Sequence, residues 1–125
     1  MSIELNHTIV VSNDAEESSG FLAEILGLSA PVRMGRFHAV QTTNGVSLDF
    51  VDVDHEVVPQ HYAFLVDESA FDEIHGRITD RGLTYWADPA QSRPNEINTD
   101  DGRRLYFLDP DGHYLEILTV PYKPW

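Results

Sequence analysis

The chain has 125 residues, 42% of them apolar and 23% charged, which is the composition of a small globular domain. Its formal charge is −13 and it has one lysine, so we expect neither a nucleic acid nor an anionic membrane as a partner. The sequence shows no membrane-span pattern, no signal-peptide pattern and no cysteine, and these features predict a cytoplasmic protein.

The first half of the chain has the pattern of a strand, a helix and further strands. Residues 3–12 alternate between apolar and polar side chains, which is typical of a strand. Ser12-Asn13-Asp14 offers capping side chains for a helix that follows with apolar residues at helical spacing. Residues 32–42 predict one or two short strands. Asn44-Gly45 then predicts a hairpin turn before a strand at 46–51.

The pattern restarts after a polar segment that ends at Pro59. Asp67 opens a second predicted helix. Residues 88–102 form a loop that is long for a compact domain, and it predicts either a lid or a surface excursion. The strands expected in this half are 61–66, 83–86, 103–108 and 113–119.

The two halves can be aligned on each other. Each has the order β-α-β-β-β, with a histidine at the start of its first strand and an acid in its last strand. The histidines are His7 and His61, and the acids are Asp49 and Glu116. This repeat predicts an α+β fold made of two βαβββ modules.

We expect the modules to form one domain that covers residues 1–125. The first module is predicted at about 3–52 and the second at about 60–119, joined by a linker at 53–59.

Glu116 lies in the return strand of a predicted hairpin, among apolar neighbours. The turn of this hairpin is Asp109-Pro110-Asp111-Gly112, whose residue types favour turn positions. A carboxylate buried in such a strand is costly unless it is paired, hydrogen-bonded or bound to a metal. A salt bridge to Arg103 or Arg104 is one explanation, and a metal ion is the other.

Two histidines and two acids at equivalent positions of a repeat favour the metal. Two imidazoles and one carboxylate on one side of an ion leave positions open for substrate and oxygen, as in non-haem iron sites, whereas a fourth protein ligand closes one of them. The alternative is that each histidine is a hydrogen-bonded core residue. The predicted metal ligands are His7, Asp49, His61 and Glu116.

The stretches LNHTIVV, HYAFLVD and YFLDPDGHYLEIL resemble the vicinal oxygen chelate superfamily, which includes glyoxalase I, extradiol dioxygenases, fosfomycin-resistance proteins and bleomycin-binding proteins. The resemblance implies that curled sheets enclose the metal, with the helices outside. It implies that His7, His61 and Glu116 are the common ligands and that Asp49 stands at the place of a fourth. It also implies a small-molecule substrate and a homodimer.

The long loop RPNEINTDDGRR, the following LYFLDPDGHYLEILT and the LDF around Asp49 resemble the ChaP-like branch. That branch implies an iron(II) oxygenase or dioxygenase that acts on a small aromatic, polyketide-like substrate chelated through adjacent oxygens. Zinc, nickel and manganese are the alternative metals. The alternative functions are a thiol (glutathione) transferase, a glyoxalase-type lyase or isomerase, and a drug-binding resistance protein without catalysis.

Three further residues are predicted beside the metal. Arg104 is expected either to hold an anionic substrate oxygen or to pair with a surface acid. Tyr106 is expected either to donate a hydrogen bond in the site or to pack in the core. His38 is a candidate base behind the ligands. The remaining histidines, in a linker, a helix and a turn, are expected to be exposed: His55, His75 and His113.

Overall fold

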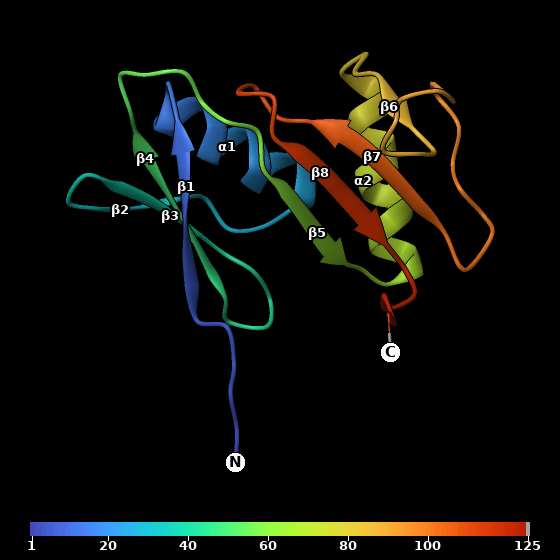
Figure 1. The fold of residues 1–125 in the computed structure, drawn as a ribbon, viewed down its shortest axis with the longest axis horizontal. Coiled ribbons are helices and arrows are strands. Elements are labelled where there is room, and N and C mark those ends of the chain that lie inside the picture. Colours follow the sequence, from blue (N-terminus) through green and yellow to red (C-terminus); the bar gives the residue numbers. More distant parts are fainter. Residues whose placement is uncertain (125) are drawn as a thin grey trace. The chain divides into compact units, whose positions relative to one another are not determined.

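The computed structural model describes residues 1–124, and the chain divides into two compact units between Val58 and Pro59. We call them unit 1 and unit 2. Each has the element order β-α-β-β-β with one helix and one mixed four-stranded sheet (Figure 1). The predicted α+β fold of two βαβββ modules is therefore confirmed. Neither helix in residues 1–124 is long and apolar enough to cross a membrane.

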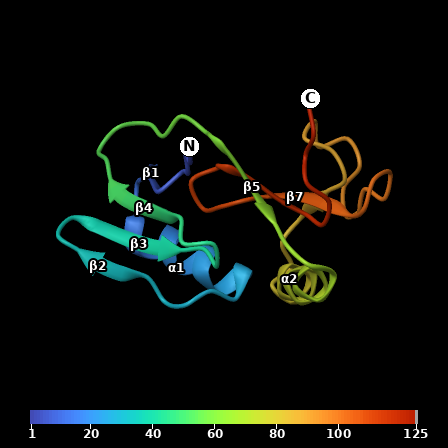
Figure 2. The ribbon, with the colours of Figure 1, turned by 90° about the horizontal axis from the view of Figure 1, so that it is seen from below.

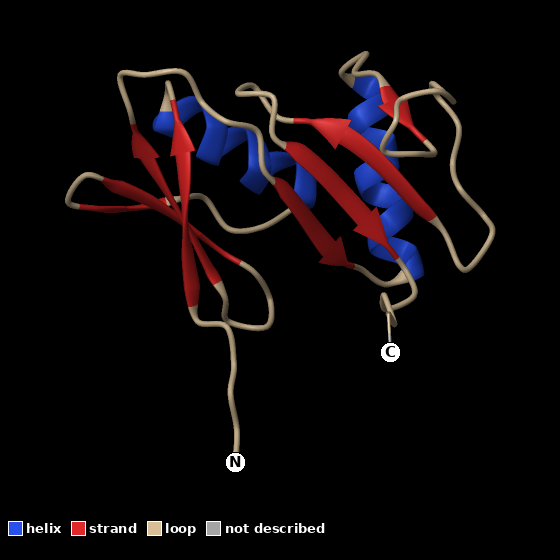
Figure 3. Ribbon diagram, in the orientation of Figure 1, coloured by secondary structure: helices blue, strands red, loops and turns tan. Residues whose placement is uncertain are grey.

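Unit 1 contains one helix and a sheet in the order β1-β4-β3-β2 (Figure 3). Strands β1 and β4 are parallel, and the other neighbouring pairs are antiparallel. The elements are β1 (His7–Ser12), α1 (Ala15–Leu26), β2 (Val32–Met34), β3 (Phe37–Gln41) and β4 (Ser47–Asp52).

Helix α1 begins and ends where its capping residues predict. The Asp14 carboxylate accepts the backbone N–H of Glu17 at 3.1 Å, and Gly27 adopts a left-handed conformation with φ of 70°. The helix covers one face of the sheet, where Val10 of β1 and Phe50 of β4 are buried. That face forms the core of unit 1.

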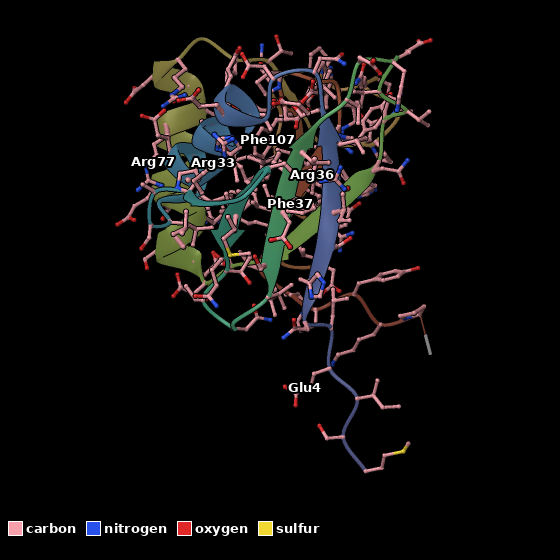
Figure 4. The ribbon with its side chains drawn as sticks, turned by 90° about the vertical axis from the view of Figure 1, so that its left-hand side faces the viewer. Glu4, Arg33, Arg36, Phe37, Arg77 and Phe107 are labelled. Carbon is pink, nitrogen blue, oxygen red and sulfur yellow. The ribbon has the colours of Figure 1, made fainter. Side chains whose placement is uncertain are left out.

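Strand β1 is shorter than predicted, since it starts at His7 and not at residue 3. Its neighbour β4 begins at Ser47, which pairs with His7, so the earlier residues have no strand to pair with. Figure 4 shows this N-terminal segment, with Glu4 labelled, extending away from the strands of unit 1. Alternation alone cannot reveal where a partner strand stops.

Unit 2 contains one helix and a sheet in the order β5-β8-β7-β6 (Figure 1). Helix α2 lies on one face of this sheet and is seen end-on in Figure 2. The elements are β5 (His61–Leu65), α2 (Glu68–Asp80), β6 (Tyr85–Trp86), β7 (Arg104–Leu108) and β8 (Tyr114–Leu118).

Side chains alternate between the two faces of this sheet, as the pleat requires. Leu105 and Phe107 of β7 and Ile117 of β8 are fully buried together with Phe71 of α2. Residues of the other parity, such as Glu116, therefore point to the face away from the helix. That second face carries the candidate site.

The predicted hairpin between β7 and β8 is confirmed. The Asp109 carboxylate accepts the backbone N–H groups of Asp111 at 2.9 Å and His113 at 2.8 Å, and Gly112 has a φ of 86°. The prediction that His113 is exposed is wrong, because its side chain is fully buried. Its Nδ1 accepts the backbone N–H of Gln60 at 2.9 Å, which satisfies the buried ring.

The long loop between β6 and β7 is tied to the sheet by backbone hydrogen bonds. Asn98 and Arg104 exchange two of them, at 2.9 and 3.0 Å, and Asn95 donates one to Tyr85 at 2.6 Å. The Asp88 carboxylate also accepts the N–H groups of Ser92 and Arg93. These bonds favour the surface excursion over the lid.

Candidate metal centre

A pocket of about 560 Å³ opens on the sheet face of unit 2 that α2 leaves uncovered. Strands β5, β7 and β8 supply most of its walls, and the segment after β8 supplies the rest. One end is polar and the other apolar. The lining residues are His61, Ala63, Leu65, Arg104, Tyr106, Glu116, Leu118, Pro121 and Tyr122.

Glu116 and His61 are hydrogen-bonded at the polar end. The distance from His61 Nε2 to Glu116 Oε1 is 2.9 Å. Glu116 is only 6% exposed, whereas the His61 side chain is 48% exposed and so faces the opening. The second carboxylate oxygen lies 3.9 Å from Arg104 Nη1, at the limit of an ion pair. Arg103 is turned away and pairs with Glu68 and Asp72 instead.

These two side chains fit a divalent metal. Two ligand atoms that each lie about 2.1 Å from one ion, at a right angle to each other, are about 3.0 Å apart. The 2.9 Å between His61 Nε2 and Glu116 Oε1 is the length of an ordinary hydrogen bond, and it also places the two atoms at the separation that one ion requires. Imidazole nitrogen and carboxylate oxygen are also the ligand types that iron and its neighbours accept. The pair therefore presents two adjacent coordination positions.

Tyr106 lies beside this pair, with its ring edge-on to the His61 ring at 6.0 Å between centroids. Burial raises the pKa of the Tyr106 hydroxyl, and the negative charge of Glu116 raises it further, while Arg104 opposes the rise. The hydroxyl therefore stays protonated at neutral pH and can donate a hydrogen bond.

Unit 1 places the other two predicted ligands on adjacent strands. Ser47 pairs with His7 and Ile9 pairs with Asp49, so both predicted ligands point to the sheet face that α1 does not cover. Asp49 is buried, and its Oδ1 accepts the Ser47 hydroxyl at 2.7 Å. Asn6 Oδ1 accepts a hydrogen bond from His7 Nδ1 at 2.8 Å, which leaves Nε2 of the exposed His7 ring available to bind an ion.

His38 lies on the opposite face of the same sheet. It pairs with Phe50, whereas the next residue, Ala39, pairs with Asp49. Since paired residues share a face and neighbours alternate, His38 shares the side that α1 covers. His38 therefore points away from the face on which His7 and Asp49 lie.

A second group of ligand-type side chains occurs in the turn between β7 and β8. One potential ligand atom each from Asp109, Asp111 and His113 lies within 4.8 Å of the others. However, the Asp109 carboxylate already accepts two backbone N–H groups, and His113 Nδ1 accepts a third. These bonds build the turn, and we assign the group that structural role.

Sequence reasoning missed four residues that line the pocket, Ala63, Leu65, Pro121 and Tyr122. It also missed Ser47, whose hydroxyl bonds to Asp49. Ala63 and Leu65 could have been found, because they follow His61 at strand spacing. Ser47 could have been found in the same way from Asp49. Tyr122 carries no such signal, since it lies outside any regular element.

Comparison with known proteins identifies relatives along nearly the whole chain. A family model described as the Glyoxalase/Bleomycin resistance protein/Dioxygenase superfamily matches residues 4–117. Oxidase ChaP-H1 is 61% identical with a TM-score of 0.95, and 97% of this chain and 98% of that chain are covered. Oxidase ChaP-H2 is 57% identical with a TM-score of 0.95 and coverage of 98% and 97%. Glutathione transferase FosA of Serratia marcescens is 34% identical over 121 residues, which cover 90% of this chain and 78% of the relative.

Proposed function

The chain belongs to the Glyoxalase/Bleomycin resistance protein/Dioxygenase superfamily, and on that premise we propose that it is an iron(II)-dependent oxygenase or dioxygenase. Its proposed substrate is a small aromatic molecule with two adjacent oxygens. The observation that carries the proposal is the buried Glu116 carboxylate, held 2.9 Å from His61 at the polar end of a pocket. Similarity to two proteins named oxidases supports the oxidative reaction.

His61 and Glu116 would hold the metal ion. We propose His7 as the third ligand and Asp49 as a fourth ligand or as a side chain behind the ligands, both from unit 1. When bound, iron(II) supplies the capacity to activate dioxygen. Zinc, nickel and manganese are the alternative ions.

The remaining polar side chains of the pocket are assigned to the substrate. Where one of the two adjacent oxygens is a hydroxyl that gives up its proton to water, the fixed positive charge of Arg104 would stabilise the resulting oxyanion. The protonated Tyr106 hydroxyl donates a hydrogen bond to the neighbouring oxygen. The low exposure of Glu116 and Tyr106 limits competing water.

The test is metal content after anaerobic purification and loading with iron(II). We expect about one ion per wild-type site and a loss of most of it in His61→Ala. The matched control is His75→Ala, because His75 lies on α2 and bonds to the Tyr85 hydroxyl, away from the pocket. Equal iron in wild type and His61→Ala would contradict the ligand assignment.

The second candidate is a thiol transferase, which the 34% identity to a glutathione transferase supports. Oxygen consumption with a catechol separates the two reactions in the iron-loaded protein. Oxygen uptake supports the oxygenase. No uptake, together with loss of free thiol in the presence of glutathione and fosfomycin, supports the transferase. Tight binding of an unchanged ligand by metal-free protein would instead support a drug-binding role.

A further inference from the structure

The pocket of unit 2 extends well beyond the side chains that the proposed reaction uses. Along β8, Glu116 pairs with Ala63 and Tyr106, and the next position on this face, Leu118, pairs with Leu65 and Arg104. Residues two apart on a strand are about 6.6 Å apart. The pocket therefore continues past the metal ligands by at least one such step, along the apolar side chains of Leu65 and Leu118.

The segment after β8 closes this apolar end. Pro121 and Tyr122 line the pocket although they belong to no helix or strand. Leu65 is 60% exposed and Tyr122 is 73% exposed. Of the three large apolar side chains exposed in the described part of unit 2, these two line the same pocket. Exposed apolar surface gathered in a pocket indicates a ligand with apolar surface of its own.

Hydrogen bonds and packing fix the start of this segment. Thr119 and Arg103 exchange two hydrogen bonds, at 3.0 Å between backbone groups and at 2.9 Å from the Arg103 N–H to the Thr119 hydroxyl. Gly102, with φ of 66°, lies against the segment: a Cβ there would collide with Val120 Cγ2 and lie 2.8 Å from the Thr119 hydroxyl. The fixed positions of Thr119 and Val120 thus hold Tyr122 at the pocket.

The size of the pocket indicates more than one ring. A closed cavity of about 150 Å³ accommodates one benzene molecule. The pocket measures about 560 Å³. A single-ring diol chelated at His61 and Glu116 would leave the apolar end unused.

We propose that Pro121 and Tyr122 form the specificity wall of the pocket and that Tyr122 stacks on the outer ring of a fused, multi-ring aromatic substrate. This inference rests on the proposed function and narrows its substrate class. The chelating oxygens lie on the first ring, at the polar end. The remaining rings lie over Leu65 and Leu118, with Tyr122 on their outer side.

The test compares a one-ring and a three-ring probe that share adjacent hydroxyl groups, namely catechol and alizarin. Both are titrated anaerobically into metal-loaded protein, and the dissociation constants are measured by calorimetry. In Tyr122→Ala we expect alizarin affinity to fall about tenfold, because stacking and buried ring area are lost. Catechol affinity should stay within about twofold.

Two controls separate stacking from other effects. Tyr122→Phe keeps the ring and should bind alizarin nearly as wild type does. Lys123→Ala changes the next residue, which does not line the pocket, and should also leave both constants within about twofold. Gly102→Ala should displace Thr119 and Val120, at the start of the segment. It should therefore lower the affinity for alizarin but not for catechol, and leave the metal content unchanged.

The outcomes distinguish this inference from the proposed function. Suppose that catechol binds to the wild type. If Tyr122→Ala then leaves the alizarin affinity unchanged, or lowers the affinities for both probes equally, the specificity wall is contradicted and the proposed function stands. If catechol and alizarin both fail to bind metal-loaded wild type, the proposed function itself fails and the wall fails with it.

Discussion

At the scale of single residues, the candidate site depends on one unusual side chain. Glu116 is a carboxylate in an otherwise apolar strand, and in the folded chain its neighbours are His61 and Arg104. Burying such a group is costly, so its position beside an imidazole favours a role that needs the charge. Tyr106 adds a hydrogen-bond donor to the same place.

Tyr106→Phe tests that donor. We expect unchanged metal content and a five- to tenfold weaker binding of catechol, since one hydrogen bond contributes about 1–1.5 kcal/mol. Because burial raises the pKa of the hydroxyl, it stays protonated up to alkaline pH, so the difference between the two proteins should be constant between about pH 6 and 9. Calorimetric titration at several pH values measures both effects.

The control for this substitution is Tyr62→Phe. Tyr62 lies on the same sheet, but its ring contacts His113 edge-on at 5.6 Å and does not line the pocket. It should bind catechol as wild type does. Equal weakening in both variants would mean that the Tyr106 hydroxyl has no specific part in binding.

At the scale of elements, two local structures position the site. The turn between β7 and β8 sets the register that puts Tyr106 opposite Glu116. The start of β7 is fixed against α2 by Arg103, whose guanidinium bonds to Glu68 and Asp72 and lies 4.3 Å from the centre of the Phe71 ring. Both features stabilise the pair of β7 and β8, which carries Glu116 together with Arg104 and Tyr106.

Asp109→Asn tests the turn. Burial raises the pKa of the Asp109 carboxyl, so the folded chain binds its proton more tightly than the unfolded chain does. The resulting stabilisation is present at low pH and is lost as the pH rises through the folded-state pKa. The amide oxygen of asparagine can still accept the two backbone bonds without that loss.

We therefore expect Asp109→Asn to be at least as stable as wild type at neutral pH. Its advantage in unfolding free energy should shrink as the pH falls and the wild-type carboxyl takes up its proton. Asp109→Ala, which loses both bonds, should cost about 1–3 kcal/mol. Urea unfolding at several pH values measures these differences. If the stability advantage of Asp109→Asn over wild type grew on acidification, the pKa of Asp109 would be lowered in the folded chain and not raised.

Arg103→Ala tests the link between β7 and α2. Both acids are largely exposed, so each ion pair contributes at most about 1 kcal/mol, and the contact with Phe71 adds about 0.5–1 kcal/mol. We expect a total loss of about 1–2 kcal/mol, seen as a lower urea midpoint. Arg93→Ala removes an exposed pair with Glu96 at 3.7 Å and should change stability by less than about 0.5 kcal/mol. Similar losses in the two variants would contradict a special role for Arg103.

At the scale of the whole molecule, we propose a homodimer. The sheet face of unit 1 that carries Asp49 also exposes apolar side chains, among them Ile9, Val32 and Met34. An exposed apolar group of this kind is typical of an interface. The superfamily resemblance supports a second copy of the chain as the partner.

Light scattering tests this assembly. The expected mass is 28.2 kDa, twice the 14.1 kDa of the chain, because the exposed apolar face of unit 1 is covered in the dimer. A monomer that retains metal and activity would contradict the proposal. Mixing His7→Ala with His61→Ala then asks whether the proposed ligands come from one copy or two, because only ligands from two copies would restore metal binding in the mixture.

Much of the fold could be predicted because it depends on local chemistry. The capping carboxylates of Asp14 and Asp67, the Asp-Pro-Asp-Gly turn and the period of apolar residues act within a few positions of the chain. The repeat also pointed to Glu116 and His61 as partners before any distance was known. The buried His113 was missed, since its hydrogen-bond partner is Gln60, far away in the sequence.

The sequence by itself determined the two βαβββ modules, the hairpin and the residue types of a candidate metal site. These features depend on the spacing and the turn preferences of residues that are close together in the chain. Only the tertiary structure decided which side chains share a face. A shift of one residue in register exchanges the two faces of a strand, which is why His38 could not be separated from the Asp49 face beforehand. The tertiary structure alone also brought Tyr122 to the pocket, since no periodic pattern governs a segment outside regular structure.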